Sequence, residues 1–167
     1  MEGAQRAVTR MLIAYDGSPE ARHALTEAAR LLRPVDIEIL TAWEPVTSQA
    51  TRALGRTGLP QTTLGAENVG ADPAYEDALA LSEEGIAMAR SLGLAARAHL
   101  VESTGHTVTA ICEAAIQLGA DVIVAGTRAR SGPHTWFTTS TSEGILRKAG
   151  IPVFVVPPRA SGGDGEG

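Results

Sequence analysis

Strands and helices alternate along this chain from one end to the other. Short apolar segments occur at residues 10–15, 37–43, 96–101, 121–125 and 151–156, and stretches with helical spacing separate most of them. This alternation predicts a parallel sheet with helices on both faces, and right-handed crossovers reduce the topology to a doubly wound fold. We therefore expect an α/β fold of the Rossmann-like or flavodoxin-like kind with a five-stranded parallel sheet.

The same pattern predicts where a ligand would bind. In a doubly wound sheet, ligands bind at the carboxyl ends of the strands where the strand order reverses. If the order reverses beside the first strand, Asp16 and Gly126 occupy the two strand ends at that point. An apolar strand that runs into a glycine presents backbone N–H groups to an anion. We expect the chemistry in the loop after Gly126 and in the helix starting near Ser140.

The first helix has the clearest start. Ser18 is a natural N-cap, Pro19 suits the first helical position and Glu20 complements the helix dipole. This helix is predicted to stop before Pro34, and its inward residues are Ala21, Ala24, Leu25, Ala28 and Leu32. Further helices are predicted at 74–92, at 107–118 and from Ser140, about four in all. In the second, the apolar spacing selects Ala78, Leu81, Gly85, Met88 and Leu92.

One domain over residues 8–158 is expected, since 167 residues with 44% hydrophobic content are enough for one core. Residues 45–73 are rich in Thr, Gly, Pro and Gln and predict a long flexible loop. A loop of that length is usually a lid or a disordered excursion. The Gly-rich tail 159–167 is predicted to be disordered.

Charge and composition exclude several classes of partner. Fourteen basic and 19 acidic residues give a net charge of −5, which argues against nucleic-acid binding and for a soluble protein. Cys112 is the only cysteine, so no intrachain disulfide can form and a cytoplasmic location is the simpler prediction. No apolar run approaches the roughly 20 residues of a membrane helix, and no secretory segment is present.

Motifs of common enzyme classes are missing. The only lysine is Lys148, in the last predicted helix, so a P-loop NTPase is excluded. There is no Gly-x-Ser-x-Gly elbow and no Gly-x-Gly-x-x-Gly after the first strand. Cys112 has the spacing of a core residue, and the four histidines lack metal-ligand spacing. We predict no catalytic residue and no metal site formed by side chains.

Three motifs carry a family resemblance. Tyr15-Asp16-Gly17-Ser18, the segment 120–128 and the segment 140–156 together resemble the universal stress protein family. The resemblance covers about 10–157, apart from the loop at 45–73. It implies the strand order 3-2-1-4-5, a homodimer and a regulatory role in stress response, with at most weak ATP hydrolysis.

ATP-binding members of that family carry Gly-x2-Gly-x9-Gly followed by Ser or Thr. In this chain Gly126 and Ser140 match, but Ala129 and Thr139 stand at the second and third glycine positions. Alanine adds one methyl group and fits at negative φ, whereas a β-branched threonine at positive φ is a serious outlier. The Thr139 hydroxyl could instead donate to a phosphate or cap the helix.

The resemblance also assigns the nucleotide-binding residues by position. They are Ala14, Tyr15, Asp16, Ala42, Gly126, Arg128, Ala129, Gly132, Thr139, Ser140 and Thr141. The ligand it implies is ATP, with Mg²⁺ as a further partner. For Asp16 the alternative is a side chain that only caps its turn. Arg128 and Arg130 either pair with phosphates or are solvated, and Trp136 and Phe137 are expected to pack on a helix or a partner.

The fifth strand suggests an interface. Val153, Phe154, Val155 and Val156 form an apolar edge strand bracketed by prolines. An uncovered apolar edge promotes aggregation, and pairing with its twin across a two-fold axis would cover it. The alternative is an edge shielded by the chain's own tail.

Two functions remain open at this point. One is a nucleotide-binding regulatory protein, which Asp16, Gly126, Gly132 and Ser140 favour. The other is a dimeric interaction module of the same fold that has lost its nucleotide, which Ala129 and Thr139 favour.

Overall fold

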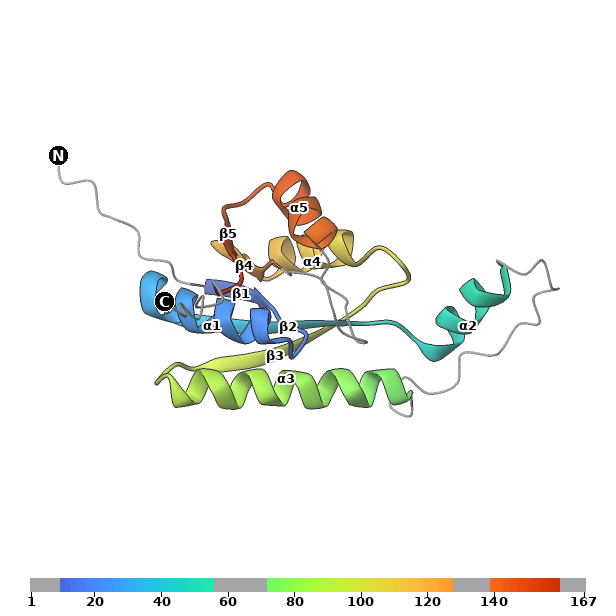
Figure 1. The fold of residues 1–167 in the computed structure, drawn as a ribbon, viewed down its shortest axis with the longest axis horizontal. Coiled ribbons are helices and arrows are strands. Elements are labelled where there is room, and N and C mark those ends of the chain that lie inside the picture. Colours follow the sequence, from blue (N-terminus) through green and yellow to red (C-terminus); the bar gives the residue numbers. More distant parts are fainter. Residues whose placement is uncertain (1–9, 56–71, 128–138, 160–167) are drawn as a thin grey trace, which may run out of the picture.

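A computed structural model describes residues 10–55, 72–127 and 139–159 and shows a sheet between two layers of helices (Figure 1). The strands are β1 (Arg10–Ala14), β2 (Asp36–Trp43), β3 (Ala96–Glu102), β4 (Val122–Gly126) and β5 (Val153–Val156). The helices are α1 (Pro19–Leu32), α2 (Val46–Gly55), α3 (Pro73–Ser91), α4 (Thr107–Gln117) and α5 (Thr139–Lys148). All strand pairs are parallel and the order is β3-β2-β1-β4-β5, which confirms the predicted fold.

Both faces of the central strand β1 are buried, because helices cover the sheet on both sides. Successive side chains of a strand point to opposite faces and therefore enter different clusters. Met11 and Ile13 pack in an apolar cluster with α1 and α3, whereas Leu12 and Ala14 pack in a second cluster with α4 and α5. All four are at most 2% exposed. A strand covered on both faces must read as a continuous apolar run, as this one does.

The start and end of α1 are as predicted. Pro19 is its first residue, and the Ser18 Oγ accepts a hydrogen bond from the backbone N–H of Ala21 at 3.1 Å. The helix ends at Leu32, before Pro34. Because the cap determines the residue at which α1 begins, it also determines the length of the turn between β1 and α1.

The buried face of α3 differs from the predicted one. Its buried residues are Ala78, Ser82, Gly85 and Ala89, and Leu92 is 39% exposed just beyond the end of the helix. A Cβ added at Gly85 would lie 2.8 Å from Cγ2 of Ile39. The helix therefore approaches β2 through small residues. The apolar spacing selects two of them, Ala78 and Gly85, but not Ser82 and Ala89.

The prediction of a loop from residue 45 is wrong over the first part of that segment. Residues 46–55 form α2, and residues 56–71 lie outside the described ranges. The hydroxyl of Thr51 donates to the carbonyl of Thr47 at 2.9 Å, and the Gln49 side chain donates to the Glu44 carbonyl at 2.8 Å. Half of the helix, Gln49, Ala50, Arg52, Ala53 and Leu54, consists of good helix formers, and the Gln49 bond ties its first turn to the residue that directly follows β2. Its apolar residues, Val46, Ala50, Ala53 and Leu54, do have the spacing of one helical face. The helix was missed because the Thr-, Gly- and Pro-rich composition of 45–73 as a whole indicated a loop.

Smaller differences concern the fifth strand and the chain ends. β5 begins at Val153 instead of residue 151, because Pro152 has no N–H for the strand ladder. The tail from residue 160 lies outside the described residues. Across the three described ranges, no helix combines the length and the apolar character needed to cross a bilayer.

Candidate functional site

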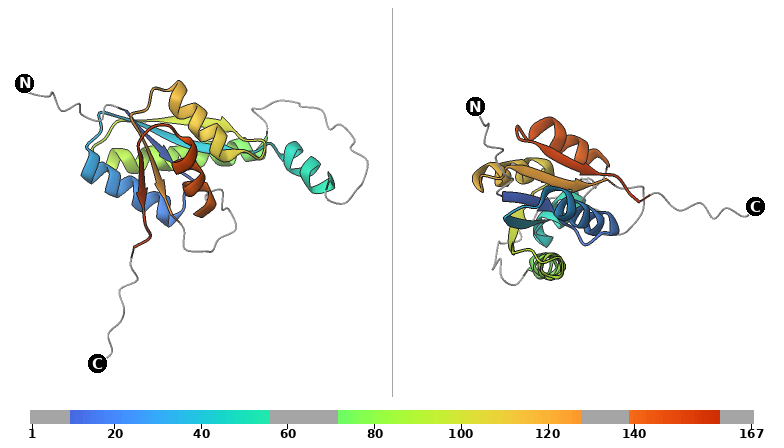
Figure 2. Two further views of the ribbon diagram at one scale, coloured as in Figure 1. Left: turned by 90° about the horizontal axis from the view of Figure 1, so that it is seen from above. Right: turned by 90° about the vertical axis from the view of Figure 1, so that its left-hand side faces the viewer.

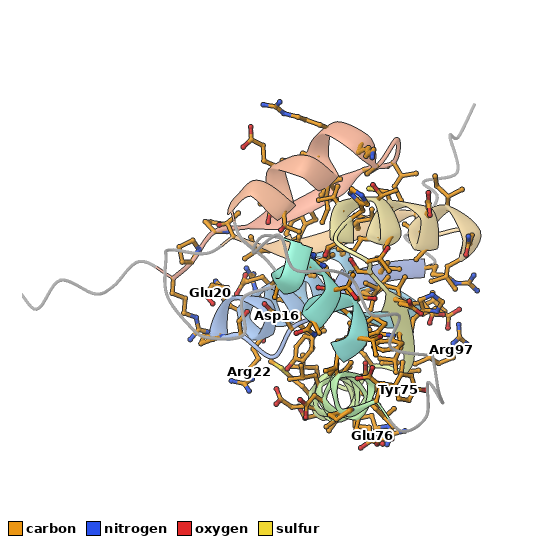
Figure 3. The ribbon with its side chains drawn as sticks, turned by 90° about the vertical axis from the view of Figure 1, so that its right-hand side faces the viewer. Asp16, Glu20, Arg22, Tyr75, Glu76 and Arg97 are labelled. Carbon is orange, nitrogen blue, oxygen red and sulfur yellow. The ribbon has the colours of Figure 1, made fainter. Side chains whose placement is uncertain are left out.

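The order of the strands reverses between β1 and β4, so the candidate site lies at their carboxyl ends. The register pairs Ile13 with Val124, and continuing it brings Tyr15 level with Gly126. Viewed onto this edge, Asp16 and Glu20 lie together at the start of α1 (Figure 3). The predicted proximity of Asp16 and Gly126 therefore follows from the observed sheet order.

A tight turn follows β1. Asp16 is 5% exposed, and its Oδ1 accepts a hydrogen bond from the backbone N–H of Ser18 at 3.0 Å. Gly17 has a φ of +70°, and a Cβ there would lie 2.5 Å from Cδ2 of Leu81 on α3. The structure thus gives Asp16 the turn-capping contact that the simpler interpretation expects, and it requires glycine at position 17.

The end of β4 lies against the first turns of two helices. A Cβ at Gly126 would lie 2.7 Å from the backbone oxygen of Glu20 in α1. The carbonyl of Gly126 accepts a hydrogen bond from the Ser142 hydroxyl of α5 at 2.9 Å. Helix N-termini carry partial positive charge and backbone N–H groups without helical partners. Their convergence here forms the kind of edge at which an anion binds.

Tyr15 has a structural role that the sequence did not reveal. Its ring is fully buried against α1 and α3, and its hydroxyl donates to Oε1 of Glu84 at 2.5 Å. The same Glu84 oxygen accepts from Nε of Arg22 at 2.8 Å. Burial, and then the bond to Glu84, raise the pKa of Tyr15, whereas the hydrogen bond from Arg22 lowers the pKa of Glu84.

The Tyr15–Glu84–Arg22 contacts tie the residue before Asp16 to both α1 and α3. No local pattern signals them, because Glu84 lies 69 residues from Tyr15 in the sequence. The backbone N–H of Tyr15 donates to the carbonyl of Leu40 at 2.8 Å and continues the sheet ladder. The ring and the backbone N–H of Tyr15 therefore both stabilise the fold.

The other predicted site residues divide into three groups. Ala14 and Ala42 are buried at 2% and 3% exposure, and Thr141 is buried in the first turns of α5. Thr139 and Ser140 begin α5, but only their backbone is described. The predictions for Arg128, Ala129, Gly132, Arg130, Trp136 and Phe137 fall outside the described residues. Ser142 was missed, and the run of hydroxyl residues at 139–142 was the signal available for it.

The backbone strain that the sequence predicts at Thr139 is not observed. That expectation assumed a positive φ at this position, but Thr139 is the first residue of α5 and has a helical backbone. Threonine is tolerated in that conformation. The backbone-strain objection to an anion site here is removed.

The described side chains form no site for a metal ion. In residues 10–55, 72–127 and 139–159 no group of three or more His, Cys, Asp or Glu side chains could hold one. Cys112 is 4% exposed, and burial raises the pKa of its thiol, in agreement with its prediction as a core residue.

The fold and this edge define a doubly wound α/β protein with a candidate anion site at its topological switch point. The model of the universal stress protein family matches residues 7–157, and the chain belongs to this family. A search of curated proteins gave no match.

Solved structures support the fold. The chain is similar to a universal stress protein from Archaeoglobus fulgidus, with 21% identity, 89% of this chain and 98% of that chain covered, and a TM-score of 0.62. The structure of the Archaeoglobus protein in complex with dAMP matches with 20% identity, 90% and 99% coverage and a TM-score of 0.56. An Arabidopsis thaliana protein of the family with AMP bound matches with 14% identity, 91% and 93% coverage and a TM-score of 0.57.

Proposed function

We propose that this chain is a dimeric stress-response regulator that binds an adenine nucleotide at the carboxyl ends of β1 and β4. The observation that carries the proposal is the meeting of the first turns of α1 and α5 at Gly126. Two helix N-termini at one strand end favour a phosphate group. The chain has no dedicated catalytic group in this proposal, so any ATP hydrolysis is weak.

The class of ligand is supported by the relatives. Members of the family from Archaeoglobus and Arabidopsis have structures with dAMP and AMP. ATP with Mg²⁺ extends the same ligand by further phosphates, which residues 128–132 and the start of α5 would bind in this proposal. The helical backbone at Thr139 supports it, because it leaves the amides at the start of α5 without strain.

Melting the purified chain with nucleotides tests the proposal. A ligand present at 100 times its Kd stabilises by about 2.7 kcal/mol. For a protein of this size that is a rise in Tm of about 5–11 °C. AMP, ATP with and without Mg²⁺, and GTP as the control base should be compared. Flat melting curves at millimolar adenine nucleotide would contradict the proposal.

The second candidate is a dimeric interaction module of the same fold without a nucleotide. It is favoured by Ala129 and Thr139, which replace two motif glycines. The hydrogen bond from the Ser18 amide also gives Asp16 a role in its turn that needs no nucleotide. The double variant Ala129→Gly, Thr139→Gly separates the candidates, since binding that appears only in this variant assigns the wild-type chain to the second.

Dimerisation is proposed through the edge strand β5. In this strand Val153, Phe154 and Val155 are only half-buried, and β5 has a neighbour in the sheet on one side. Sedimentation should give a dimer for the wild type and a monomer for Val155→Lys. The matched control is Val35→Lys, at a residue 64% exposed, which should stay dimeric. A dimeric Val155→Lys would count against this interface.

A further inference from the structure

Helix α2 projects beyond the carboxyl end of β2, away from the other helices (Figures 1 and 2). It has no extensive packing against another helix or strand within the described ranges. A helix of ten residues with Thr and Ser in it is not stable alone in water. The contacts at its base must therefore decide whether α2 keeps its place.

Those contacts are few, and most of them are polar. The Arg52 guanidinium forms an ion pair with the Glu44 carboxylate, and Nε2 of Gln49 donates to the Glu44 carbonyl at 2.8 Å. The backbone N–H of Val46 donates to Oδ2 of Asp72 at 3.0 Å. Arg52 also lies beside the turn after β3, since a Cβ at Gly105 would be 3.4 Å from its Nη2.

The Glu44–Arg52 pair is the contact most costly to break. The Glu44 side chain is 4% exposed, whereas Arg52 is 49% exposed. A buried carboxylate that loses its cation is strongly destabilised, far more than an exposed one. Loss of Arg52 removes the cation that compensates this carboxylate, and a movement of the segment from Glu44 to α2 that exposes Glu44 to water becomes more favourable.

This pair lies on the edge where the nucleotide site is proposed. The register pairs Ala14 with Leu40, and continuing it brings Asp16 level with Ala42, two residues before Glu44. We propose that the Glu44–Arg52 pair is a latch that holds α2 off this edge, and that its release frees α2 to move across the site as a gate. The gating part of this inference rests on the proposed function, whereas the latch does not.

Hydrogen exchange of the full chain without nucleotide tests the latch. In Arg52→Gln, amides of 46–55 should exchange at least about tenfold faster than in the wild type, with α1 and α4 unchanged. Arg52→Lys, which keeps the charge, should fall between the two. The matched control is Arg147→Gln, which breaks the exposed Arg147–Glu143 pair on α5 and should leave 46–55 unchanged. Unchanged exchange of 46–55 in Arg52→Gln, or equal acceleration of every helix, would overturn the latch.

Stopped-flow binding of AMP tests the gate. In this proposal α2, once freed from Glu44, lies across the site for most of the time, so the association and dissociation rate constants of AMP should both fall severalfold in Arg52→Gln. Rates equal to those of the wild type would overturn the gate. If AMP does not bind the wild-type chain, the proposed function fails, and the exchange comparison still decides the latch.

Discussion

Gly126 is the position at the candidate site where an added methyl group would come closest to backbone atoms of another element. A Cβ there would lie 2.7 Å from the backbone oxygen and 2.8 Å from the carbonyl carbon of Glu20. These are backbone atoms in the first turn of α1, so relief requires the helix itself to shift. At Gly144 in α5 the nearest atoms, 2.8 and 3.2 Å away, are the two methyl carbons of Val108. These are side-chain atoms of a half-buried residue, so no backbone atom blocks the added methyl group there.

The size of the effect follows from this difference. Overpacking a rigid site costs about 1–3 kcal/mol, so we expect Gly126→Ala to lower the free energy of unfolding by about 2 kcal/mol. At this chain length that corresponds to a fall in Tm of about 4–8 °C. In Gly144→Ala a gain of about 1 kcal/mol in helix propensity offsets the steric cost, and we expect stability close to that of the wild type.

Calorimetry and urea unfolding of the two variants and the wild type measure this directly. Far-ultraviolet circular dichroism should be the same for all three, and adenine-nucleotide binding should weaken in Gly126→Ala only. The reasoning is refuted if Gly126→Ala melts within about 1 °C of the wild type, or if Gly144→Ala loses as much.

Two further predictions concern the contacts of Tyr15. Tyr15→Phe removes the hydrogen bond to the partly exposed Glu84 carboxylate and should lower the free energy of unfolding in urea by about 1 kcal/mol, whereas an unchanged midpoint would mean that the hydroxyl contributes nothing. The hydrogen bond from Arg22 holds the pKa of Glu84 below its ordinary 4.5, so its contribution is present above that pH and is lost as pH falls through the lowered pKa. Urea unfolding from pH 7 downwards should therefore show a smaller acid loss for Glu84→Gln than for the wild type. The control Glu83→Gln, at the exposed neighbouring residue, should follow the wild type, and equal acid losses in all three chains would contradict this.

The features that could be predicted from the sequence are local or periodic. The Ser18 cap, the apolar strands and the alternation of strands with helices depend on residues close together in the chain, and the parallel sheet follows from them. The positions of Asp16 and Gly126 at one edge follow in turn, because parallel strands end on the same side.

The remaining features depend on distant contacts or on weak patterns. The hydroxyl of Tyr15 donates to a residue of α3 that is distant in the sequence. Of the buried residues of α3, Ser82 and Ala89 were not predicted, because Leu and Met at neighbouring positions are more apolar. The apolar face of α2 is short and lies in a segment whose Thr-, Gly- and Pro-rich composition indicates a loop. Polar bonds to Glu44 and Asp72 hold the helix, and no local pattern predicts them. For Thr139, the family motif suggested a glycine-like backbone, whereas the chain places the residue inside a helix.

The central strand β1 has one hydrogen-bonded neighbour nearby in the sequence and one far from it. Met11 pairs with Ile37 on one side and with Val122 on the other. During synthesis, the edge of β1 that pairs with β4 has no partner until most of the chain has left the ribosome. Long-range pairing of this kind slows folding, and a partly folded chain with an unpaired strand edge, which is prone to aggregation, persists for longer. A nascent or truncated chain that stops before residue 122 therefore carries an open sheet edge and is a natural substrate for chaperones and proteases.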